Sequence, residues 1–172
     1  MSAFTTDSDI VCKFPGVVTE GPDGAVAVGR TLSKAVSPGL LILLYGPLGA
    51  GKTLLSVSIG ERLGASRMKS PSFAIESIHS LPGKNFPLVH ADLYRLEDAS
   101  NEAMQLEEYL DDGAIVLVEW AERWINPPRH NRWDVHISAA GETRRTIDFS
   151  AYGAGTLAAF SAVFSELLTP CR

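Results

Sequence analysis

The sequence has few of the features that mark specialised classes of protein. Its two cysteines, Cys12 and Cys171, stand near opposite ends, with no CxxC pattern and no histidine at metal-ligand spacing. This excludes a cysteine-based metal site and a dithiol redox motif, so we expect two free thiols. The longest apolar run, residues 40–45, is far shorter than the roughly 20 residues that span a bilayer. We therefore expect no membrane segment.

Basic charge and targeting signals are also scarce. The formal net charge is −5, which argues against a broad electrostatic grip on nucleic acid, because non-specific binding needs clustered Lys and Arg. The first residues lack the basic start and apolar stretch of a secretory signal, so we expect a cytoplasmic protein. The chain has 172 residues, of which 45% are hydrophobic and 20% charged. These values predict one globular domain over residues 1–172.

Hydrophobic periodicity and turn residues predict alternating strands and helices. We expect strands over residues 10–18, 40–45, 73–78, 88–92 and 114–118, and helices over 23–36, 52–63, 100–110 and 156–168, the last within a C-terminal segment 153–172. Residues 133–138 and 143–149 flank a turn and predict an antiparallel hairpin. Residues 1–9 are polar, and we expect them to be disordered. The order predicts a three-layer α/β domain with a mostly parallel central sheet plus the hairpin.

One segment carries a specific chemical motif. Residues 46–53, Gly-Pro-Leu-Gly-Ala-Gly-Lys-Thr, match G-x-x-x-x-G-K-[ST] between a predicted buried strand and a predicted helix. Glycines let backbone N–H groups turn toward phosphate oxygens, and the helix N-terminus adds partial positive charge. The motif predicts a P-loop NTPase that binds ATP with Mg²⁺, with Lys52 at the β- and γ-phosphates and Thr53 on the metal. The expected nucleotide-binding residues are Gly46, Leu48, Gly49, Ala50, Gly51, Lys52, Thr53 and Leu54.

Two carboxylates end predicted buried strands. Asp92 ends residues 88–92 and Glu119 follows residues 114–118, so both are expected at the nucleotide crevice, where the carboxyl ends of parallel strands meet. One can hold the magnesium while the other orients the attacking water as general base. The sequence leaves the two roles open between them. Each carboxylate also fits a simple capping role.

Hydroxyl, aromatic and imidazole side chains complete the candidates. Ser70 and Ser72 lie between the P-loop helix and the Asp92 strand, which fits a γ-phosphate switch or, equally, an ST-turn. The three tryptophans are interpreted as core or interface packing, and the four histidines, which show no metal-ligand spacing, as structural or surface residues. These are Trp120, Trp124 and Trp133, and His79, His90, His130 and His136.

Four motifs in order resemble a known family, the small bacterial ATPases of tRNA threonylcarbamoyladenosine biosynthesis called TsaE or YjeE. They are Leu-Gly-Ala-Gly-Lys-Thr at 48–53, Lys-Ser-Pro-Ser-Phe at 69–73, His-Ala-Asp-Leu-Tyr-Arg-Leu at 90–96 and Val-Glu-Trp-Ala-Glu at 118–122. The string Asp-Leu-Tyr-Arg-Leu is the most family-specific of these. The resemblance covers residues 24–149 and leaves the extension after Tyr152 unmatched.

The resemblance implies an accessory ATPase. Such a protein docks on the two-protein threonylcarbamoyl-transferase complex (TsaD/TsaB-like), supports its turnover by ATP hydrolysis, meets tRNA only through that complex and hydrolyses ATP weakly alone. The catalytic residues expected here are Lys52, Asp92, Glu119 and Ser72. Arg95 is the candidate arginine finger, with a structural salt bridge as the alternative.

The sequence departs from the family pattern at four positions. Pro47 replaces an acidic residue, Ser72 a threonine, Ala121 a proline, and Ala25 a hydroxyl residue expected near the adenine. Ser72 keeps the hydroxyl that the switch needs.

Two other functions share a P-loop. A small-molecule kinase would need an acceptor pocket and usually an Arg-rich lid, and no such lid segment is visible in the sequence. A nucleotide-dependent binding switch would need little hydrolysis, and Glu119 beside a possible switch favours hydrolysis over that reading.

Overall fold

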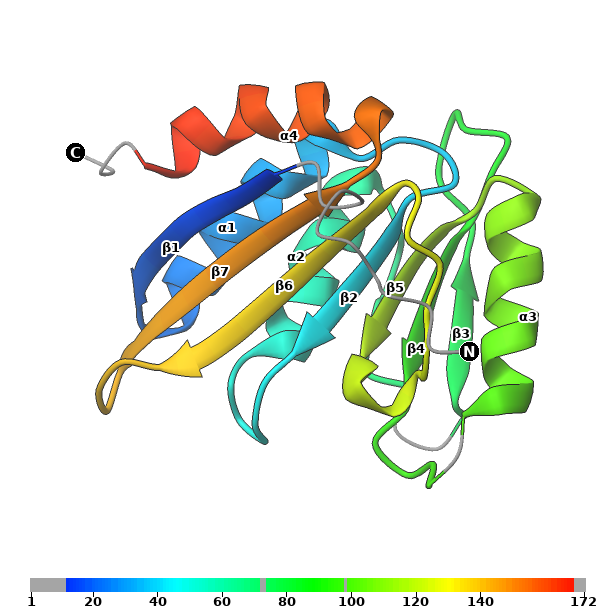
Figure 1. Ribbon diagram of the computed structural model, residues 1–172, viewed down its shortest axis with the longest axis horizontal. Coiled ribbons are helices and arrows are strands. Elements are labelled where there is room, and N and C mark those ends of the chain that lie inside the picture. The colour runs from blue at the N-terminus through cyan, green and yellow to red at the C-terminus, as the bar shows by residue number, and fades with distance from the viewer. Residues whose placement is uncertain (1–11, 72–73, 98, 169–172) are drawn as a thin grey trace, which may run out of the picture.

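The computed structural model describes residues 12–71, 74–97 and 99–168, which form one seven-stranded sheet with helices on both faces (Figure 1). The predicted disorder of residues 1–9 and the positions of Ser72 and Phe73 lie outside the described residues. The strands are β1 (Cys12–Glu20), β2 (Leu41–Tyr45), β3 (Glu76–His79), β4 (Leu88–Asp92), β5 (Ile115–Glu119), β6 (Arg132–Ala139) and β7 (Arg144–Tyr152). The helices are α1 (Gly21–Leu32), α2 (Lys52–Leu63), α3 (Ser100–Asp111) and α4 (Ala154–Leu167), with short 3₁₀ turns η2 (Ser33–Ala35) and η3 (Ala121–Arg123).

The sheet joins a parallel centre to antiparallel flanks. Its strand order is β1-β7-β6-β2-β5-β4-β3, in which β2 is parallel to both β5 and β6, and β4 is parallel to β5. The predicted hairpin is confirmed as β6 and β7, and β1 and β3 add antiparallel edges. The carboxyl ends of β2, β4 and β5 therefore lie at one edge of the sheet, where a crevice forms in open α/β folds.

The side-chain alternation of β2 and β5 explains the three layers. Ile42, Leu44 and Leu117 belong to the apolar cluster that includes residues of α1, α2 and α4, whereas Leu43 and Val118 belong to the cluster that includes residues of α3. Strands covered on both faces must be apolar throughout, which is why these segments read as continuous apolar runs. The predicted three-layer fold is confirmed, with α3 covering the opposite face from the other helices (Figure 1).

Several predicted boundaries were wrong for local reasons. The first helix was expected over residues 23–36, but α1 begins at Gly21 with Glu20 at its N-cap, and Asp23 lies in the first turn, where its charge interacts favourably with the helix dipole. The same helix ends at Leu32 instead of residue 36, and the 3₁₀ turn η2 follows it before Val36. β1 continues to Glu20 because a bulge between Phe14 and Val17 accommodates Pro15 and Gly16.

A buried ion pair lies on β6, on the face away from α4. Trp133 and Val135 pack in the cluster that contains α4, so Arg132 and Asp134 point to the other face. The Arg132 Nε lies 2.9 Å from Asp134 Oδ1, and its Nη1 donates to the carbonyls of Pro127 and Pro128 at 3.1 and 3.0 Å. Burial raises the pKa of Asp134, while Arg132 opposes that shift.

No helix in the described part of the chain is long and apolar enough to cross a membrane.

Candidate functional site

The loop between β2 and α2 is shaped by its glycines. Gly46 has a φ of +140°, and a Cβ added there would lie 2.4 Å from the Ile137 carbonyl oxygen on β6. Gly51 has a φ of +107° and directly precedes α2. A side chain at Gly46 would collide with the backbone of the neighbouring strand, so only glycine fits the first position of the motif. The loop ends on a helix N-terminus, whose free N–H groups and dipole favour an anion.

Lys52 begins α2 and is folded back onto the loop. Its side chain is buried, and its ammonium donates to the Gly46 carbonyl at 2.5 Å and the Pro47 carbonyl at 3.0 Å. The same nitrogen lies 3.7 Å from the centroid of the Trp120 ring, a cation–π contact. Burial lowers the pKa of Lys52, although the negative charges of Glu122, Glu119 and Asp92 counteract that shift. The lysine is therefore held in the loop by contacts that a phosphate can replace.

Glu119, at the end of β5, forms a hydrogen bond with the first turn of α2. It ends β5 with 2% of its surface exposed, and its Oε2 accepts a hydrogen bond from Thr53 Oγ1 at 2.6 Å. Its other oxygen, Oε1, lies 2.7 Å from Nε2 of His90, which is fully buried. Both oxygens of this carboxylate thus have a protein partner.

Asp92 lies beside Glu119, because the two residues are paired in the parallel register of β4 and β5. Its Oδ2 accepts a hydrogen bond from Ser70 at 3.2 Å and its Oδ1 accepts one from the Tyr94 backbone N–H at 3.0 Å. The predicted hydroxyl segment therefore reaches the site through Ser70. Ser72, the other predicted switch residue, lies outside the described residues.

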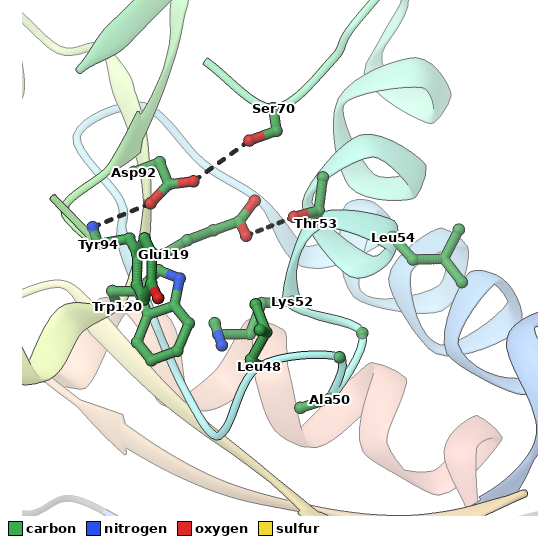
Figure 2. Close-up of a pocket in the computed structure, with 12 residues that line it drawn as sticks. Leu48, Ala50, Lys52, Thr53, Leu54, Ser70, Asp92, Tyr94, Glu119 and Trp120 are labelled. Carbon is green, nitrogen blue, oxygen red and sulfur yellow. Dashed lines mark hydrogen bonds between the residues drawn. The ribbon is translucent and has the colours of Figure 1, made fainter. Parts of the chain in front are cut away.

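These residues surround one cleft of about 400 Å³ (Figure 2). Its lining consists of Leu48, Gly49, Ala50, Gly51, Lys52, Thr53, Leu54, Ser70, Asp92, Tyr94, Glu119 and Trp120. The structure thus brings together the predicted loop and both carboxylates, while Gly46 contributes the carbonyl that holds Lys52. Arg95, the candidate for either an arginine finger or a structural salt bridge, is exposed and does not line this cleft in the described part of the chain.

The interpretation of two aromatic residues as packing or surface groups was incomplete. Trp120 lines the cleft and covers Lys52, whereas Trp124 and Trp133 are buried in the core. His90 was assigned no part in the site, yet it contacts Glu119. Their positions in the sequence could have placed both residues in the site. Trp120 directly follows Glu119, and His90 stands two residues before Asp92 on the same face of β4.

A second hollow of about 270 Å³ continues from the loop. It shares Gly49, Ala50, Gly51 and Leu54 with the cleft. The remaining lining comes from the start of α1 and the β6–β7 turn, namely Gly21, Pro22, Ala25, Glu142, Thr143 and Arg145. Ala25, the departure noted in the sequence, lies in this wall. The turn residues were missed because their approach to the loop depends on the register of the hairpin.

The donor set at the cleft suits a hard cation. Thr53 supplies a hydroxyl, and Glu119 and Asp92 supply carboxylates, the oxygen ligands that Mg²⁺ prefers. The described residues contain no cluster of three or more His, Cys, Asp or Glu side chains that could hold a metal ion. A magnesium ion here would need further oxygens from bound phosphate and water, as Mg²⁺ usually does in proteins.

Comparison with known proteins agrees with this geometry. The family model described as "Threonylcarbamoyl adenosine biosynthesis protein TsaE" matches residues 19–147. The chain belongs to the TsaE family. The match spans the P-loop, both carboxylates and most of the hairpin, so the resemblance drawn from the four motifs is confirmed.

Curated TsaE relatives and a solved structure extend the match. A TsaE from Bacillus subtilis is 36% identical over 136 residues, covering 78% of this chain and 84% of the relative. A TsaE from Streptomyces coelicolor is 40% identical over 120 residues, covering 67% and 80%. Both are named tRNA threonylcarbamoyladenosine biosynthesis proteins. The crystal structure of Bacillus subtilis YdiB shares the fold with a TM-score of 0.65 and 29% identity, over 91% of this chain and 93% of that one.

Proposed function

We propose that this TsaE-family chain binds Mg-ATP in the 400 Å³ cleft and hydrolyses it to support tRNA threonylcarbamoyladenosine modification in the cytoplasm. The observation that carries the proposal is the Thr53–Glu119 hydrogen bond of 2.6 Å. It places a P-loop hydroxyl and a strand-end carboxylate together, as a Mg-nucleotide site requires. Replacement of that hydrogen bond by a shared cation would keep both oxygens in use.

The geometry supports one division of the roles that the sequence left open between Glu119 and Asp92. Glu119 touches Thr53, so we assign it to the magnesium side of the site. Asp92 is held by Ser70 and by the Tyr94 backbone instead, which favours the task of orienting the attacking water. Lys52 and the α2 N-terminus would neutralise the phosphates. The adjoining hollow of about 270 Å³ would take the base and ribose.

A partner completes the proposed activity. Within the described residues, no arginine lines the 400 Å³ cleft, and an arginine finger supplied by a partner raises hydrolysis in other P-loop enzymes by about 10³–10⁵. The partner proposed is a TsaD/TsaB-like threonylcarbamoyl-transferase complex, which would bring the tRNA. With this arrangement we expect the isolated chain to hydrolyse ATP slowly.

The test is ATP hydrolysis by the purified chain alone, and with the transferase complex and tRNA. We expect slow hydrolysis alone, stimulation by the complex, and loss of activity in Lys52→Ala and Glu119→Ala. Phosphorylation of a metabolite without partners would support a kinase instead. Binding without stimulated hydrolysis would support a nucleotide-dependent switch.

A further inference from the structure

We propose that His90 is a positioning residue that orients Glu119 toward the magnesium side of the cleft. The inference rests on the proposed Mg-nucleotide function and adds a residue to it. His90 lines neither hollow; its influence would pass through the Glu119 carboxylate.

The hydrogen bond between them has a defined direction. A carboxylate only accepts hydrogen bonds, so the 2.7 Å contact to Glu119 Oε1 requires a hydrogen on Nε2 of His90. The other ring nitrogen, Nδ1, is buried without a hydrogen-bond partner among the described residues. The geometry therefore assigns Nε2 of His90 as the donor and Oε1 of Glu119 as the acceptor.

With His90 as the donor, the two oxygens of Glu119 have different hydrogen-bond partners. His90 occupies Oε1 from the interior of the sheet, while Thr53 contacts Oε2 at the cleft. Without the imidazole donor, Oε1 would be a buried carboxylate oxygen with no partner, and rotation of the side chain toward solvent would relieve that cost. Such rotation would remove Oε2 from Thr53. Hydrogen-bond donors that contact a metal ligand from behind commonly fix its orientation.

Two amide variants separate the donor from mere bulk. In His90→Gln the side-chain nitrogen is the same number of bonds from Cα as Nε2, so it can still donate to Glu119. In His90→Asn the amide is one bond shorter and falls away from Oε1. Both variants have similar polarity, and His79→Asn is a control on the same face of the sheet, because His79 bonds Ser77 rather than Glu119.

The readout is the affinity for a fluorescent ATP analogue with saturating Mg²⁺ and with EDTA. We expect His90→Asn to lose about 10- to 100-fold of the Mg²⁺-dependent gain in affinity, with its affinity in EDTA unchanged. His90→Gln and His79→Asn should resemble the wild type. In a Glu119→Gln background, His90→Asn should cause no additional loss, since the carboxylate it positions is gone.

The possible negative results separate failure of the proposed function from failure of the positioning role of His90. If the wild type gains no affinity from Mg²⁺, the proposed function fails. If the wild type gains affinity and His90→Asn gains as much, or if both amide variants lose it equally, the positioning role is overturned. Should His90→Asn not fold, the ¹⁵N shifts of the wild-type His90 ring decide: a hydrogen on Nε2 supports the role, and a bare Nε2 overturns it.

Discussion

Two buried cationic side chains, Arg132 on β6 and Lys52 at the start of α2, differ in what surrounds them. Arg132 is enclosed by Asp134, by two backbone carbonyls and by the ring of Tyr152, 4.1 Å from its guanidinium. Lys52 is also buried, but it adjoins an open cleft and is held by loop carbonyls and a tryptophan ring. Buried charge alone does not identify a functional site. A buried charge indicates a functional site when it adjoins an open cleft and a bound ligand can replace its protein partners.

The difference between their surroundings predicts that Arg132 contributes to the stability of the fold and that Lys52 contributes to ATP binding. In Arg132→Met, Asp134 would remain as a buried charge without its partner, so we expect the free energy of unfolding to fall by about 3–5 kcal/mol. Urea denaturation measures this. Arg132→Met combined with Asp134→Leu should recover much of the loss, and nucleotide affinity of the folded variants should stay unchanged. A fully stable Arg132→Met protein would contradict the structural role of this pair.

Lys52→Ala should produce the opposite pattern. Hydrogen bonds from a charged donor contribute about 1.5–3 kcal/mol, so we expect ATP affinity to fall by about 10- to 150-fold, measured by calorimetry. Thermal unfolding without nucleotide should change little, because the lost hydrogen bonds reach only loop carbonyls and the lost contact with the Trp120 ring lies beside an open cleft. Undiminished binding in this variant would remove the phosphate role from the loop.

The pH dependence of binding should report the same lysine. Burial lowers the pKa of Lys52 in the free protein, and a neutral amine binds phosphate poorly. ATP affinity should therefore decline as the pH rises through this lowered pKa, at a pH below that of an ordinary lysine, because binding must then take up a proton. Lys52→Arg is the matched control, since its guanidinium stays charged and should remove the alkaline decline. An identical decline in that variant would assign it to another group.

The smallest expected effect is spectroscopic. A phosphate that attracts Lys52 would remove its ammonium from the Trp120 ring, a contact worth about 0.5–2 kcal/mol. Tryptophan emission should change when ATP is added. Trp120→Phe should abolish the change, whereas Trp124→Phe should preserve it because that residue is buried away from the cleft. A signal that survives Trp120→Phe would show that the ring does not follow the lysine.

The sequence predicted the parallel half of this molecule well. The strand, glycine loop and helix around Lys52 follow from local patterns, and Asp92 and Glu119 were expected at strand ends, where they are now paired. The contacts that complete the site are long-range. Glu119 and Thr53 are 66 positions apart, and the pairing of β4 with β5 puts His90 and Glu119 on one face.

Local strain was equally hidden from the sequence. Trp120 has a φ of +58°, an unusual value for a bulky residue. This backbone conformation precedes η3, a turn that no periodic pattern predicted, and the Trp120 ring covers Lys52. Propensities describe average residues, whereas this one is constrained by the packing around it.

Gly46 gives the loop a dependence on the distant hairpin. The carbonyl of Ile137 on β6 occupies the space that any side chain at Gly46 would need. A glycine loop grafted here from a known ATPase would therefore have to match the path of this hairpin, as well as its own glycine spacing. Conversely, an insertion that shifts β6 by a fraction of an ångström would reshape the loop without changing any residue of the loop itself. The conformation of the loop at Gly46 therefore depends on the position of β6, which lies about ninety residues later in the sequence.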